Sequence, residues 1–105
     1  MPLTRDFKET IKARAETDGA FREALLTEAL DCFLAGDTET GKSILRDYIN
    51  ATIGFEALGT STGKDAKSLM RMLGPKGNPQ ARNLFDVIAH LQQREGVHFH
   101  VHPSR

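Results

Sequence analysis

The chain has 105 residues, of which 39% are hydrophobic and 27% are charged, and its formal net charge at pH 7 is zero. This balance is typical of one globular domain, which we place over residues 1–105. No apolar run approaches the roughly 20 residues that span a bilayer, and no basic-then-apolar signal peptide opens the chain. We therefore expect a cytoplasmic protein without membrane contact. The single cysteine, Cys32, lies in an apolar run and is expected to be a core thiol in a reducing compartment.

Apolar residues spaced by three and four predict helices over residues 5–15, 20–35 and 38–53. The apolar stripe of the second helix is broad for a surface helix. This helix either lies centrally in the core or packs partly against another chain. Side chains that can cap the three helices stand at their starts, at Thr4, Asp18 and Asp37.

The junction between the second and third helices carries a string that matches the phosphate-binding P-loop pattern. Residues 36–43 read Gly-Asp-Thr-Glu-Thr-Gly-Lys-Ser. A P-loop follows a buried strand and cradles phosphate with backbone N–H groups, whereas this string follows a helix. Asp37 and Glu39 would also repel phosphate. We interpret the string as a helix C-cap at Gly36 followed by an N-cap at Asp37, without nucleotide binding.

Residues 55–73 predict a helix-turn-helix, with helices over 55–61 and 66–73. Gly59 leaves room for the second helix to cross the first closely, and Gly63 suits the tight turn because positive φ is easiest for glycine. Asp65 is a good N-cap for the second helix.

The second helix of this pair has two different faces. Leu69, Met72 and Leu73 share one side by helical spacing and are expected to face the core. The outer side carries Ala66, Lys67, Ser68, Met70 and Arg71. A short helix with an apolar inner face and a small, basic outer face is what reading a DNA major groove requires. The alternative is an ordinary helical hairpin with a solvated outer face.

The segment 74–79 is dense in turn formers and precedes a last helix over 79–94, with Asn78 as N-cap and Pro79 at the first helical position. Residues 97–102 then alternate apolar and polar residues, which predicts a short strand. A lone strand needs a partner, either its copy in a second subunit or another protein's sheet edge. The alternative is a tail packed loosely on the helices.

His98, His100 and His102 fall on one face of the predicted strand. Same-face residues on one strand lie nearly 7 Å apart, by a rise of about 3.4 Å per residue, which is too wide for all three to bind one tetrahedral Zn²⁺ without distortion. Solvated or partner-facing histidines are expected instead. We expect no metal site, no cofactor and no catalytic arrangement, and hence no enzyme.

The zero net charge hides two segments of opposite sign. Residues 64–82 carry five basic side chains and one acidic one, whereas residues 16–40 carry seven acidic side chains and one basic one. The basic segment suits nucleic acid. The acidic segment suits a basic protein partner, or is a solvated helix face.

From Leu58 to Leu91 the pattern resembles the lambda-repressor-like (Xre) DNA-binding domains. The stretch 54–73, followed by Gly-x-x-Gly-Asn-Pro and an amphipathic helix, is similar to the addiction-module antidote family of HigA-like antitoxins. This resemblance implies an all-α, five-helix lambda-repressor-like fold, here with a short C-terminal β-strand. Two positions depart from the family pattern, which has alanine at Gly59 and an apolar residue at Lys64.

Carried over residue by residue, the resemblance implies a DNA-binding surface. It places Leu58, Gly63, Leu69 and Leu73 in structural roles. Groove-facing positions fall to Ala66, Lys67, Met70 and Arg71, and phosphate-facing positions to Lys76, Asn78, Gln80 and Arg82, with Lys64 as an added phosphate contact. Ser68, on the same helix, is also counted among the DNA-binding residues.

The resemblance also implies a homodimer on a palindromic operator that represses its own operon and neutralises a RelE/HigB-type toxin by direct binding. A stand-alone transcriptional regulator without a toxin is the alternative. A third possibility is an interaction module that keeps the fold without binding DNA.

Overall fold

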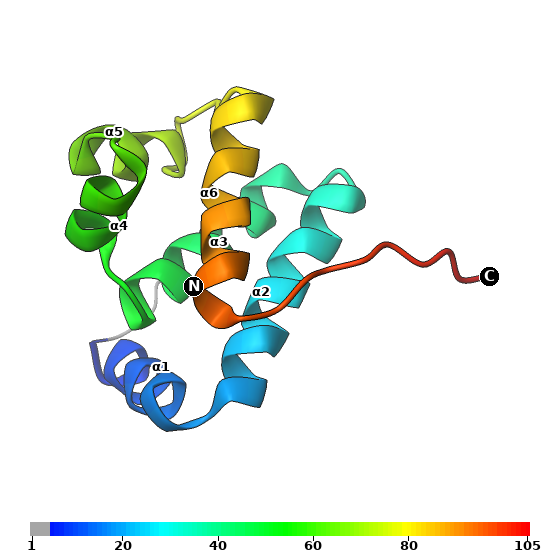
Figure 1. Cartoon of the computed structure of the whole chain (residues 1–105), viewed down its shortest axis with the longest axis horizontal. Helices are drawn as coiled ribbons and strands as arrows, with labels where there is room; N and C mark the ends of the chain where they lie inside the picture. The colour runs from blue at the N-terminus through cyan, green and yellow to red at the C-terminus, as the bar shows by residue number, and fades with distance from the viewer. Residues whose placement is uncertain (1–4) are drawn as a thin grey trace.

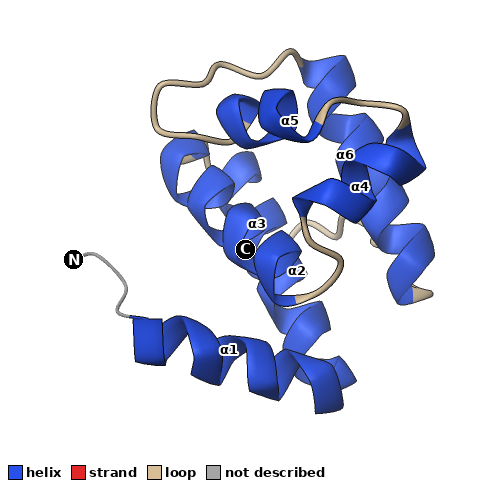
Figure 2. Cartoon of the chain, turned by 90° about the vertical axis from the view of Figure 1, so that its left-hand side faces the viewer, coloured by secondary structure: helices blue, strands red, loops and turns tan. Residues whose placement is uncertain are grey.

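In the computed structural model of the chain, residues 5–105 are described and form six α-helices (Figure 1). Within these residues no β-strand is present, and Figure 2 shows the helices joined only by loops. The helices are α1 (Arg5–Thr17), α2 (Gly19–Leu34), α3 (Thr38–Ala51), α4 (Phe55–Thr62), α5 (Ala66–Met72) and α6 (Ala81–Glu95).

The all-α class is confirmed, and each of the six helical segments predicted from the residues is present in residues 5–105. The count of five helices implied by the resemblance is wrong. The predicted strand over 97–102 is also wrong. No other part of the described chain offers a strand edge to pair with. Phe99 instead packs against the core, and its N–H donates to Gln92 Oε1 at 2.9 Å.

Short polar side chains start three of the helices as expected. The carboxylates of Asp18, Asp37 and Asp65 accept from the backbone N–H three residues on, at 3.1, 3.2 and 3.0 Å. These bonds satisfy donors that a helix start leaves unpaired. The predicted cap Thr4 lies outside the described residues.

The start of α6 differs from the prediction. Gln80 is its N-cap, and helix begins at Ala81 rather than at Pro79. Gly77 lies close to the carbonyl oxygens of Arg71 and Met72 at the end of α5, and Gln80 is extended directly before α6.

Helix α3 lies at the centre of the core and packs against α1, α2 and α4. Its residues Leu45, Tyr48 and Ile49 are almost fully buried, as are Leu26 and Ala29 in the middle of α2. The middle of α2 therefore lies in the core, as the first of the two alternatives expected. At the end of α2, in contrast, Leu34 is 70% exposed.

No helix within residues 5–105 combines the length and the apolar character needed to cross a bilayer.

Candidate nucleic-acid interface

The outer face of α5 is open to solvent. Lys67, Ser68 and Arg71 are exposed, and Met70 is 43% exposed. Ala66 is half-buried at the start of the helix. The inner face is anchored as expected by Leu69 and, just after the helix, by Leu73, both of which are buried.

A close crossing of α4 and α5 holds this helix in place. A Cβ atom on Gly59 would lie 2.6 Å from the carbonyl oxygen of Lys64 and 3.2 Å from the amide nitrogen of Ala66. These distances are too short for an ordinary contact, so the backbone of α5 approaches α4 where only glycine fits. Gly63 ends α4 with φ of +71°, which confirms the role predicted for it.

The outer face of α5 continues into an open hollow beside the loop to α6. Six of the ten predicted contact residues line it, together with backbone and apolar atoms of α5 and the loop. The six are Lys64, Ser68, Arg71, Lys76, Asn78 and Gln80. Ammonium, guanidinium, amide and hydroxyl groups thus gather from α5, from its preceding turn and from the loop after it. Such donors suit an anion such as a phosphate group.

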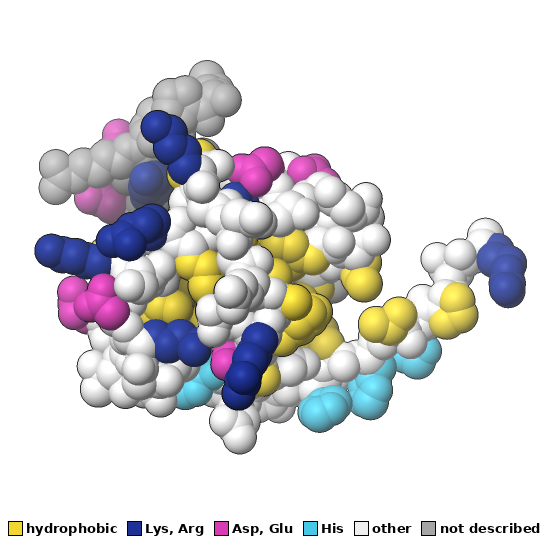
Figure 3. Space-filling view, turned by 90° about the horizontal axis from the view of Figure 1, so that it is seen from above, with side chains coloured by type: hydrophobic (Ala, Val, Ile, Leu, Met, Phe, Trp, Pro, Cys, Tyr) yellow, Lys and Arg dark blue, Asp and Glu magenta, His cyan; other side chains and the backbone are white. Residues whose placement is uncertain are grey.

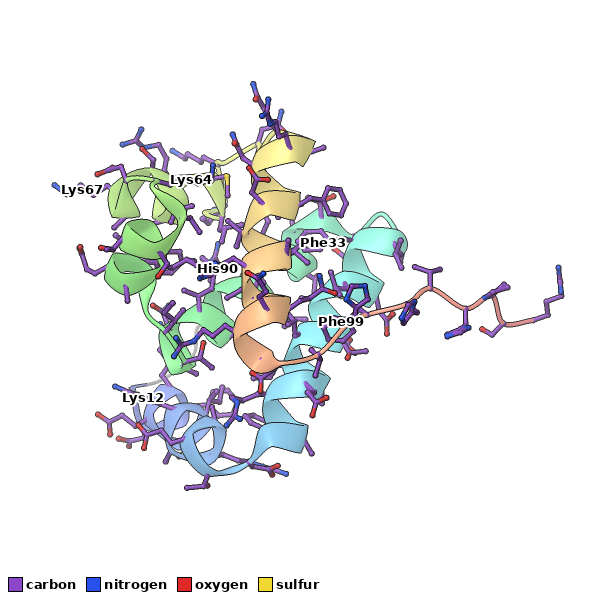
Figure 4. All side chains as sticks on the ribbon, in the orientation of Figure 1. Lys12, Phe33, Lys64, Lys67, His90 and Phe99 are labelled. Carbon is purple, nitrogen blue, oxygen red and sulfur yellow. The ribbon has the colours of Figure 1, made fainter. Side chains whose placement is uncertain are left out.

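The remaining four predicted residues do not line this hollow. Ala66, Lys67 and Met70 belong to α5, and Arg82 is exposed in the first turn of α6. Viewed from above, Lys and Arg side chains stand out over the half of the molecule opposite the extended tail, with a few acidic side chains among them (Figure 3). Figure 4 shows Lys64 and Lys67 at the same end of the molecule, and Lys12 at the other.

Lys64 is less available than the prediction assumed. Its side chain is only 27% exposed, and Nζ lies 3.6 Å from Asp86 Oδ2 and 3.4 Å from Asn83 Oδ1, both on α6. This lysine therefore connects the turn before α5 to α6. The same two contacts explain how a charged residue is accommodated after the turn glycine, where the resembled family has an apolar one.

Two cations of α3, which the sequence analysis did not single out, hold the end of α5 and the loop after it. Lys42 is 1% exposed, and its Nζ donates to the carbonyl oxygens of Gly74 at 3.0 Å and Gly77 at 2.7 Å. Arg46, one turn further along α3, donates to the carbonyl oxygen of Leu73. Leu73 is the C-cap of α5, so Arg46 lies at the partly negative end of that helix, whereas Lys42 binds carbonyls of the loop after it.

The sequence does indicate that Lys42 is buried. It shares the inward stripe of α3 with Leu45 and Ile49, at offsets of three and seven. A charged residue on a buried stripe needs a partner, because an unpaired buried charge is costly. Which carbonyls would accept it was not visible, since they lie 32 and 35 residues away.

These contacts also explain the P-loop-like string. Asp37 caps α3, as expected, but the C-cap of α2 is Ala35, and Gly36 follows it with φ of +82°. A Cβ on Gly41 would come within 2.7 Å of the Phe33 ring, so that glycine lets the ring lie on α3. Lys42 is committed to Gly74 and Gly77, and Glu39 Oε2 pairs with it at 2.8 Å.

The cysteine and histidines show no assembled reactive site. Cys32 is half-buried, and burial, with smaller effects from nearby carboxylates, raises the pKa of its thiol. The rings of His98 and His100 are 5.2 Å apart, and those of His100 and His102 are 6.5 Å apart. Within residues 5–105, no three His, Cys, Asp or Glu side chains are grouped so that they could hold a metal ion.

Three comparisons with known proteins give no relative: the chain matches no protein-family model, no curated protein and no solved structure. The resemblance to HigA-like antitoxins therefore stays a prediction from the residues of this chain.

Proposed function

We propose that the chain is a DNA-binding antitoxin of a type II toxin–antitoxin module, which represses its own operon and neutralises a RelE/HigB-type toxin by direct binding. In this proposal α4 and α5 form a helix-turn-helix of the lambda-repressor-like kind. The sequence resemblance described above supports this assignment.

The observation that carries the proposal is the exposed outer face of α5 together with the adjoining polar hollow. A recognition helix must be seated by its apolar side and accessible on the other, and α5 meets both conditions in residues 5–105. The cations around it supply the electrostatic attraction that dominates DNA affinity.

The side chains divide into two roles. Arg71 can donate two hydrogen bonds to guanine O6 and N7, and Lys67 can reach guanine or a phosphate. Met70 offers apolar contact to a thymine methyl group. Residues that lie beside α5 rather than on it position the duplex by its phosphates: Lys76, Asn78, Gln80 and Arg82.

The acidic segment 16–40 is assigned to the basic toxin. Asp18 and Asp37 cap helices, and Glu39 pairs with Lys42, so these three carboxylates are partly engaged within the fold. The exposed acidic side chains left on α2 are Glu23, Glu28 and Asp31. They can attract a positively charged ribonuclease, although a solvated helix face remains the competing interpretation.

Two substitutions test the DNA proposal. Arg71→Ala is expected to weaken binding to the DNA upstream of the gene by about 1–3 kcal/mol and to relax preference at one base pair. Lys76→Ala is expected to weaken binding to all sequences alike and to lower the salt slope by about one. Lys12→Ala, which removes a cation at the far end of the molecule, is the matched control. Unchanged binding in both variants would contradict DNA recognition by this surface.

A stand-alone transcriptional regulator is the alternative function, because the α5 surface serves either role equally well. Co-purification with the product of the adjacent gene separates the two. An antitoxin is expected to bring down a small basic ribonuclease, and reversing the charges of Glu23 and Glu28 is expected to weaken that complex. The proposed homodimer predicts a mass twice that of the chain by sedimentation.

A further inference from the structure

We propose that Lys42 is a positioning residue for the candidate interface: its buried ammonium fixes the turn 74–77 and thereby places Lys76 beside α5. The expected effect of Lys42 on DNA affinity rests on the proposed function. Its effect on the order of the turn 74–77 does not, and the two effects can be measured separately.

The ammonium of Lys42 is surrounded by three acceptors. The carbonyl oxygens of Gly74 and Gly77 accept at 3.0 and 2.7 Å, and Glu39 Oε2 lies at 2.8 Å. An ammonium has three N–H donors, so this set satisfies all of them. The side chain is 1% exposed, and a buried cation remains charged only when it is paired and hydrogen-bonded.

Both carbonyls belong to one tight turn. The N–H of Gly77 donates to the carbonyl oxygen of Gly74 at 3.0 Å, which closes a four-residue turn with Pro75 and Lys76 at its corner. Lys42 therefore binds the first and last residues of the turn, and Lys76 is exposed between them. Because Lys42 fixes both ends of the turn, it also fixes the backbone of Lys76 between them.

The turn is pressed against α5 from the other side. A Cβ on Gly77 would overlap with the carbonyl oxygens of Arg71 and Met72. Arg46 meanwhile donates to the carbonyl oxygen of Leu73, directly before the turn. The turn thus lies between the last residues of α5 and the cations of α3.

An outward movement of the turn would remove two of the three acceptors of the buried ammonium and leave only Glu39, which is energetically costly. Lys76 is therefore kept near Arg71, and both residues line the same hollow. Spacing between a base-reading group and a phosphate-binding group has to be fixed, because phosphate contacts set the register of the protein on the duplex.

Amide hydrogen exchange by NMR tests the turn without any DNA. Lys42→Met keeps a side chain of similar length and removes the ammonium. We expect the amide of Gly77 to exchange at least about tenfold faster, while amides in the middle of α6 keep their rates. Lys12→Met removes an equal charge at the far end of the molecule and is expected to change neither.

A second variant keeps the test open should Lys42→Met fail to fold. Gly77→Ala leaves Lys42 intact but forces the turn away from the carbonyls of Arg71 and Met72, and the amide of residue 77 is expected to lose protection in the same local way. Equal acceleration of all amides would mean that Lys42 stabilises the whole fold without positioning the turn. Unchanged exchange at residue 77 in Lys42→Met would overturn the proposal outright, whatever Gly77→Ala shows.

The effect on DNA affinity is tested by a double-mutant cycle of Lys42 and Lys76. If Lys42 acts through Lys76, Lys42→Met is expected to lower affinity about tenfold or more in the wild-type chain and by much less in a Lys76→Ala background. Equal losses in the two backgrounds would contradict action through Lys76. If the wild-type chain binds no DNA, the proposed function fails, while the exchange measurement still decides whether Lys42 holds the turn.

Discussion

At the scale of single side chains, Lys64 shows how a residue placed at the interface can be occupied within the fold. Its ammonium lies 3.6 Å from the carboxylate of Asp86, and that carboxylate is about half exposed. Asp86→Asn would free the lysine for a phosphate and remove a negative charge near the duplex. We expect two- to several-fold tighter DNA binding, with a salt slope that increases by up to about one.

Fluorescence titration at several salt concentrations measures this change, and Asp31→Asn on α2 is the matched control because it removes the same charge elsewhere. Weaker binding by Asp86→Asn would mean that the Lys64–Asp86 pair is needed to hold the turn before α5 in its binding position.

Residue-scale predictions succeeded where the information was local. Helical spacing correctly separated buried Leu69 and Leu73 from exposed Lys67 and Arg71. The roles of Lys42 and Lys64 could not be predicted in detail. Apart from Glu39, which lies three residues from Lys42, their partners lie 19 or more residues away in sequence, and such pairs are decided by how the helices pack.

At the scale of elements, the crossing of α4 and α5 depends on Gly59. Alanine is normally favoured over glycine inside a helix by about 1 kcal/mol. Here its Cβ would lie 2.6 Å from the carbonyl oxygen of Lys64, so one helix would have to shift. We expect Gly59→Ala to reduce the free energy of unfolding by about 1–3 kcal/mol and to weaken DNA binding.

Urea unfolding followed by circular dichroism provides the measurement. A more stable Gly59→Ala protein would show that α5 can move away from α4 at little cost, and the close crossing would then not be needed. The HigA-like family that the sequence resembles has alanine at this position. The same experiment therefore shows whether α4 and α5 cross too closely here to accommodate that alanine.

Every predicted helix end lies within two residues of the observed one, because caps and apolar spacing are properties of short segments. The prediction of a strand over 97–102 was wrong because it also used only local information. Alternation is also a local signal, but a strand requires a partner, and within residues 5–105 the tail has none. The apolar side chain of Phe99 is used to dock the tail on the core.

At the scale of the whole molecule, a buried polar network ties four helices together. Glu95 at the end of α6 accepts from Arg22 Nε of α2 at 3.0 Å and from the Tyr48 hydroxyl of α3 at 2.5 Å. Arg22 also donates to the carbonyl oxygen of Ala15 in α1 at 2.6 Å. This connection between α1 and α6 could not be predicted from the sequence, because it joins residues up to 73 positions apart.

Because of this network, the free energy of unfolding is expected to depend on pH in the alkaline range. Burial first, and then the hydrogen bond to Glu95, raise the pKa of Tyr48 well above its ordinary value of 10.0. A raised folded-state pKa means that the contribution of the protonated hydroxyl is complete below pH 10 and is lost as the pH rises through the folded value. The fold is therefore expected to weaken above pH 10.

Tyr48 is the single tyrosine of a chain without tryptophan, so tyrosinate absorbance reports on this group alone. We expect the absorbance to rise only well above pH 10, together with loss of helical circular dichroism, and to rise near pH 10 in urea. Ionisation near pH 10 with the helices intact would contradict the buried hydrogen bond.

The proposed function requires the exposed face of α5 to contact base edges. The most direct test is to titrate the wild-type chain and Arg71→Ala against the duplex upstream of the gene, single-base variants of it and a scrambled duplex. We expect the wild-type chain to prefer the upstream duplex by at least about a thousandfold, and Arg71→Ala to lose discrimination at one base pair. Equal binding of the upstream and scrambled duplexes by the wild-type chain would mean that α5 does not read base pairs.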